Sequence, residues 1–121
     1  MDVLAVEQAL RELRPLTPEI SVRAWQRCDA YESGLIAFQP PAAGAAAPAP
    51  PADAPRQILH ADRDVLCHVL RGAGRLRLAD EDLPLGPGLL CGVPAGTPHD
   101  FAATGAEPLV LYYTTIRVAP A

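Results

Sequence analysis

The side chains of this chain that are best suited to metal or acid–base chemistry are a few histidines and carboxylates. One residue separates His60 from Asp62, and His99 follows later in the chain. Two imidazoles and one carboxylate are the ligand set of non-haem Fe(II) oxygenases. Asp62 would share a face with His60 if a strand continued through both, but residues 61–64 are also typical of a turn. The sequence therefore leaves open whether Asp62 joins the two histidines.

Sulfur and amine chemistry are less well supported. The chain has three cysteines, Cys28, Cys67 and Cys91, with no C-x-x-C spacing. This odd number argues against a disulfide framework or a thiolate zinc site, so we expect reduced thiols. All ten basic residues are arginine, which excludes a lysine Schiff base.

Size and charge exclude several classes of protein. The 121 residues, of 12.8 kDa, fit a single domain spanning 1–121. The net charge of −4 argues against a nucleic-acid partner. No apolar run approaches the roughly 20 residues of a membrane-spanning helix. Acidic Asp2 and Glu7 do not resemble an export signal, so we expect a cytoplasmic protein.

The elements that must position these residues follow from local patterns. Residues 2–14 predict a short helix capped by Asp2, with an apolar face made of Val3, Val6, Leu10 and Leu13. Residues 40–55 are almost entirely Ala, Pro and Gly and predict a mobile loop. The remainder predicts short strands separated by turns, which indicates an antiparallel sandwich or barrel. These strands are expected at 22–28, 34–39, 57–61, 65–70, 75–79, 89–93, 99–103 and 108–118.

One motif is more specific. Gly88 is followed, after five residues, by Pro94, then by Gly96 and, two residues later, by His99. This spacing resembles the second motif of the cupin family, and the resemblance covers residues 56–118. It implies an all-β fold, the double-stranded β-helix or jelly-roll barrel, here with a short N-terminal α-helix.

The family's first motif is only partly kept. Counted back from Gly72, the resemblance places His60 at one ligand position, whereas Ile58 and Val65 stand at two others. It therefore implies a site with two of the usual four metal ligands, His60 and His99. The ion would be a divalent metal such as Fe, Zn, Mn or Ni. Asp64, one position out of phase with the missing ligand, is expected to face solvent.

Strand alternation predicts which side chains face the interior. The expected pocket is mostly apolar, lined by Ile58, Val65, Cys67, Val69 and Cys91. His68 has the opposite parity and should lie on the outer face. Only one of Tyr112 and Tyr113 can point inward. The candidates for acid–base chemistry are therefore His60, His99 and that inward tyrosine.

Three functions remain open. The first is a small cupin that binds a small molecule around the two histidines, with or without a metal. The second is an enzyme of the same fold, such as an Fe(II) dioxygenase, isomerase, cyclase or lyase. The third is a non-catalytic sensor module with a decayed metal site. Residues 22–28, with Trp25 at their centre, predict an exposed edge strand and hence a homodimer.

Overall fold

The computed structural model of the chain describes residues 2–40 and 60–118. The predicted loop at 40–55, apart from Pro40, lies outside the described residues, and so does Ile58. The helix is α1 (Val6–Arg11). The strands are β1 (Arg14–Pro15), β2 (Ile20–Arg27), β3 (Tyr31–Phe38), β4 (Arg63–Arg71), β5 (Gly74–Arg77), β6 (Asp82–Leu85), β7 (Leu90–Val93), β8 (Asp100–Ala103) and β9 (Leu109–Arg117).

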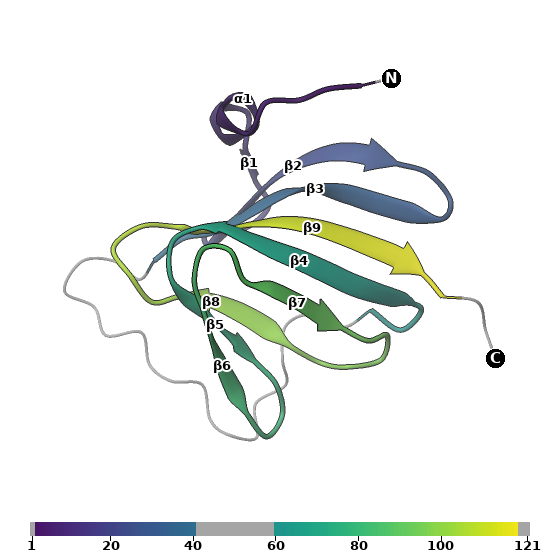
Figure 1. The fold of residues 1–121 in the computed structure, drawn as a ribbon, viewed down its shortest axis with the longest axis vertical. Coiled ribbons are helices and arrows are strands. Elements are labelled where there is room, and N and C mark those ends of the chain that lie inside the picture. Colours follow the sequence, from purple (N-terminus) through teal and green to yellow (C-terminus); the bar gives the residue numbers. More distant parts are fainter. Residues whose placement is uncertain (1, 41–59, 119–121) are drawn as a thin grey trace.

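The described strands form two antiparallel sheets. The larger has the order β1-β2-β3-β9-β4-β7, and the smaller has the order β6-β5-β8. Figure 1 shows the smaller sheet on one side of the larger, with α1 on the other. The predicted all-β jelly roll is confirmed. The hydrogen bonding of the two sheets does not join into a closed barrel, because β8 pairs with β5 and not with the larger sheet.

The main core lies between the two sheets. The larger sheet contributes Leu109, Leu111 and Val69, each fully buried. The smaller sheet contributes Leu76 and Phe101. Each such side chain adds roughly 1.5–3 kcal/mol to folding when it leaves water. This apolar layer therefore holds β8, and His99 just before it, against the larger sheet.

The helix packs on the outer face of the larger sheet and is shorter than predicted. Its N-terminal cap is Ala5, with no side-chain hydrogen bond, and Asp2 instead accepts a hydrogen bond from Gln26 Nε2 at 2.8 Å. Because the chain before Ala5 is not helical, Val3 stays 84% exposed. The buried helical residue is Ala9. It packs with Leu35, Ala37, Val110, Leu4, Leu10 and Leu13.

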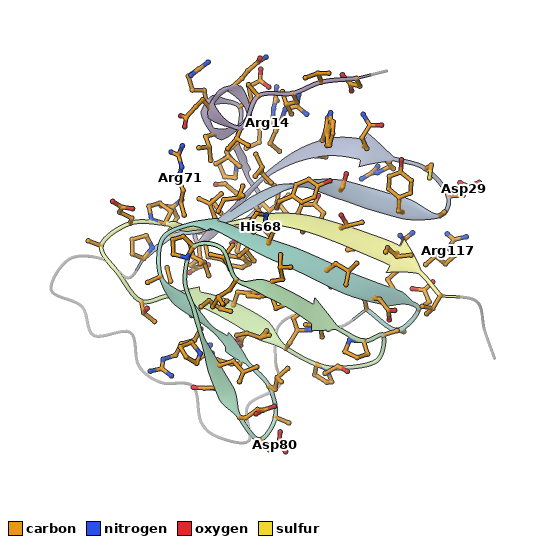
Figure 2. All side chains as sticks on the ribbon, viewed as in Figure 1. Arg14, Asp29, His68, Arg71, Asp80 and Arg117 are labelled. Atoms are coloured by element: carbon orange, nitrogen blue, oxygen red, sulfur yellow. The ribbon has the colours of Figure 1, made fainter. Side chains whose placement is uncertain are left out.

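An ion pair ties this helix to the larger sheet. Arg71, in the last position of β4, forms it with Glu7 of α1. Figure 2 shows Arg71 at the end of the molecule where the helix lies, and Asp80 far from it, at the tip of the β5–β6 hairpin. The helix is therefore anchored by one apolar face and by charge.

Two strands, β1 and β6, were not predicted, and β1 partly covers β2, which was predicted to be an exposed edge strand. β6 contains Pro84, and β1 is only two residues long. β1 pairs with Ser21 and Val22, so the first part of β2 is not a free edge. Within the described residues, nothing pairs with the rest of β2 on that side. No helix in this part of the chain is long and apolar enough to cross a membrane.

Candidate functional site

His99 is carried by a tight turn between β7 and β8. The N–H of Thr97 donates to the carbonyl oxygen of Pro94 at 3.2 Å. Between them, Gly96 has a φ of +82°, in the left-handed region that favours glycine at the third position of a type II turn. The Pro-Ala-Gly-Thr sequence thus fixes the direction in which the chain reaches His99.

Two groups, one just before β4 and one at its start, hold this turn in place. The carbonyl oxygen of His60 accepts a hydrogen bond from Gly96 N–H at 2.8 Å. A carboxylate oxygen of Asp64 accepts one from Ala95 N–H, also at 2.8 Å. The expectation that Asp64 faces solvent is therefore wrong, because its half-buried side chain binds the backbone of the turn. These bonds bring residues that are distant in the sequence beside each other.

As a result, the two predicted histidines face each other. The ring centroids of His60 and His99 are 6.4 Å apart, with 41° between the ring planes. His99 is 1% exposed, whereas His60 is half-buried. Phe101 packs edge-on against the His99 ring, with centroids 5.7 Å apart.

The tautomer of His99 follows from its hydrogen bond. Its Nδ1 lies 2.9 Å from the carbonyl oxygen of Thr97, which can only accept, so Nδ1 carries the proton. Nε2 is then an unprotonated acceptor, and it is buried with no partner among the described residues. An unsatisfied buried polar atom costs about 1–3 kcal/mol, so Nε2 calls for a partner such as an ion, a ligand or a water.

Burial also keeps this imidazole neutral. Desolvation lowers the pKa of His99 below its ordinary value of 6.5, and the neighbouring His60 lowers it further. The Thr97 carbonyl and Asp100 oppose this shift but do not outweigh it. At neutral pH His99 therefore offers a free lone pair at Nε2.

Asp62 does not gather with the histidines. Its side chain is exposed, and its backbone carbonyl accepts a hydrogen bond from Val118 N–H at 3.0 Å. Across residues 2–40 and 60–118, no group of three or more His, Cys, Asp or Glu side chains is placed to hold a metal ion. The described part of the chain therefore supplies the two imidazoles without the carboxylate of the predicted triad.

Tyr113 is the inward-facing tyrosine of the pair. It packs against the main core, and its hydroxyl donates to Glu32 Oε1 at 3.3 Å. Burial, together with the negative charge of Glu32, raises the pKa of Tyr113 to about 12. Tyr112 lies on the other face, with its ring 6.4 Å from that of Trp25. No sequence pattern indicates the Glu32–Tyr113 contact, because the two residues are far apart in the chain.

The other predicted site residues follow strand alternation. Val65, Cys67 and Val69 are buried in the main core, and Cys91 packs against it. His68 is exposed on the outer face, as expected, beside Tyr112 and Leu70. These four side chains therefore lie in the packed layer between the sheets, whereas Ile58, also predicted to line the pocket, lies outside the described residues.

Comparisons with known proteins agree with this architecture. A family model described as a cupin domain, Cupin_2, matches residues 48–115. A search of curated proteins finds no match. Among solved structures, the chain is similar to TT1209 from Thermus thermophilus, with 21% identity, 97% of this chain and 98% of that one covered, and a TM-score of 0.70.

Other similar structures include a protein named KdgF and a predicted enzyme. KdgF from a Halomonas species is 20% identical, with 88% of each chain covered and a TM-score of 0.65. A predicted oxalate decarboxylase from Thermotoga maritima is 15% identical, with 82% of this chain and 81% of that one covered and a TM-score of 0.64. At these identities the likeness concerns the fold alone.

Proposed function

The chain belongs to the cupin family, and from this premise we propose that it is a small-molecule-binding cupin. In this proposal His60 and His99 would hold one divalent metal ion, which would supply a Lewis acid for the polar end of the ligand. The observation that carries the proposal is the buried, unpartnered Nε2 of His99, on a ring whose centroid lies 6.4 Å from that of His60.

The chemistry of His99 fits a metal ligand. Ligating histidines usually donate one ring N–H to a carbonyl or carboxylate and bind the metal through the other nitrogen. The Thr97 carbonyl fixes this arrangement at His99. A neutral ring also has no charge to repel a cation, and the pKa of His99 is lowered by burial.

The described residues supply two protein ligands, fewer than the three of catalytic zinc sites. We therefore expect weak binding of the ion alone and tighter binding when a ligand adds oxygen donors. When bound, the ion would supply Lewis acidity toward such an oxygen. The histidines hold it, Asp64 keeps the turn in place, and Val65 with its neighbours excludes water from the ligand's apolar part.

The ligand class follows from the two kinds of side chain proposed to contact it, the metal-binding histidines and the apolar residues around Val65. One end would need carboxylate, hydroxyl or carbonyl oxygens to reach the ion. The remainder would be apolar, to match the side chains of Val65 and Cys67, which lie in the apolar layer between the sheets. We therefore propose a small organic acid or hydroxy-carbonyl compound with an apolar body.

Calorimetric titration with Zn²⁺, Mn²⁺ and Ni²⁺ tests the proposal, at protein concentrations high enough to detect weak binding. We expect one ion per chain, lost in the His60→Ala and His99→Ala variants. His68→Ala is the matched control, because His68 lies exposed on the outer face and should leave binding unchanged. No binding by the wild-type protein, or equal loss in the control, would contradict the proposal.

A further inference from the structure

A second reactive feature lies on the interior face of the larger sheet. Cys67 in β4 and Cys91 in β7 stand directly opposite each other in the antiparallel register. Opposed residues in a sheet point to the same face, so both thiols turn toward the main core. Neither belongs to the histidine pair, and both are free thiols.

The backbone places the two residues at a separation that suits a disulfide. Val69 N–H donates to Leu89 O at 2.9 Å, which makes these two residues a hydrogen-bonded pair of the ladder, although the bond back to Val69 O comes from Gly88 N–H. Since such pairs alternate along antiparallel strands, Cys67 and Cys91 form the next one, with Cα atoms about 5.5 Å apart. Disulfides join Cα atoms about 4.4–6.8 Å apart, so the Cα separation is suitable. They also need Cβ atoms about 3.5–4.5 Å apart, so the edge strand must bring the two Cβ atoms together by about 1 Å.

The two thiols have different roles. A hydrogen bond from Cys67 lowers the pKa of Cys91, although burial opposes the shift. The same bond, together with burial, raises the pKa of Cys67. Cys91 is also the more exposed of the two. The half-buried Cys91 is therefore the more readily deprotonated of the two thiols, and buried Cys67 is the less readily deprotonated.

We propose that Cys67 and Cys91 form a redox-active dithiol site that reacts with hydrogen peroxide or small hydroperoxides. The Cys91 thiolate attacks a peroxide oxygen, the O–O bond breaks, and hydroxide leaves, which gives a sulfenic acid. Cys67 sulfur then attacks Cys91 sulfur, the S–O bond breaks, and the Cys67 proton leaves with the hydroxide as water. Overall, two thiols are oxidised to one disulfide, and hydrogen peroxide is reduced to water.

This bond would act close to the candidate site. β7 is the edge strand of the larger sheet and pairs only with β4 among the described strands. It leads directly into the turn that carries His99. A Cys67–Cys91 disulfide would therefore fix the edge strand that precedes this turn.

The test uses reduced, full-length protein treated with a slight excess of hydrogen peroxide. Remaining thiols are then blocked under denaturing conditions, and the digest is mapped by mass spectrometry. We expect free thiols to fall from three to one, with a Cys67–Cys91 linkage within one chain and Cys28 still free. Dithiothreitol should restore all three.

Variants separate this pair from the exposed cysteine. Cys28→Ser should form the same linkage as the wild type, because Cys28 is exposed and lies outside the pair. Cys67→Ser should stop at the sulfenic acid of Cys91, which dimedone traps. If the Cys67→Ser variant fails to fold, the linkage map of the wild-type protein still tests the proposal. Oxidation confined to Cys28, or no Cys67–Cys91 linkage in the wild type, would overturn the proposal.

Discussion

Removal of the Asp64 carboxylate should loosen the turn that carries His99. In the folded chain this half-buried carboxylate accepts the Ala95 N–H at 2.8 Å. A hydrogen bond to a charged group contributes about 1.5–3 kcal/mol, and partial solvent exposure reduces this to about 1–2 kcal/mol. At the average entropy of unfolding for a chain of this size, each kcal/mol shifts Tm by about 4 °C. We therefore expect Asp64→Ala to lower Tm by about 4–8 °C.

Thermal unfolding followed by circular dichroism measures this shift. Asp62→Ala is the matched control, because Asp62 lies two residues before Asp64 and its carboxylate is exposed. The variant removes the same charge, and its Tm should change by less than about 2 °C. Asp64→Ala should also weaken metal binding at His99, because the turn no longer holds the ring. Equal Tm values for the two variants would refute the role given to Asp64.

Three further predictions concern stability and assembly. Burial lowers the pKa of His99 below 6.5, so between that lowered pKa and 6.5 the unfolded chain binds more protons than the folded chain. The free energy of unfolding should therefore fall as the pH drops below about 6.5. Urea titration measures this dependence, which the His99→Phe variant should lose. Asp100 accepts two hydrogen bonds from Arg77, at 2.6 and 3.1 Å. Asp100→Ala should therefore lower the free energy of unfolding, measured with a chemical denaturant, by about 3 kcal/mol. Asp80→Ala, at the exposed tip of the β5–β6 hairpin, should leave it almost unchanged. The outer face of the larger sheet exposes Leu66 and Leu90, whose exposed fractions are 49% and 77%, so we predict that the protein is a homodimer. Light scattering should find a dimer that the Leu90→Glu variant disrupts. A monomeric wild-type protein would contradict this prediction.

Strand alternation made the faces of the sheets predictable. Because successive residues point to opposite sides, the sequence alone places His68 outside and allows only one tyrosine of 112–113 inside. The spacing from Gly88 to His99 likewise predicts a tight turn, and the positive φ of Gly96 is the reason for a glycine there. Periodicity and turn chemistry are local properties, so one sequence is enough to read them.

Contacts between distant segments were not predictable in the same way. Asp2 was expected to cap a helix, but it binds Gln26, because that contact depends on where β2 passes. Alternation gives Asp64 a face but does not show that a turn wraps around the strand end beside it. β6 was missed because Pro84 is unusual in strands; it is accommodated because β6 is an edge strand.

The most direct test of the central claim uses the three imidazoles of this chain as separate reporters. Nitrogen-15 NMR should find His99 protonated at Nδ1 and unprotonated at Nε2 at neutral pH. Added Zn²⁺ should then shift the ring signals of His60 and His99 together, at one equivalent, and leave exposed His68 unchanged. A His99 ring protonated at Nε2, or a metal response at His68 alone, would contradict a shared site at His60 and His99.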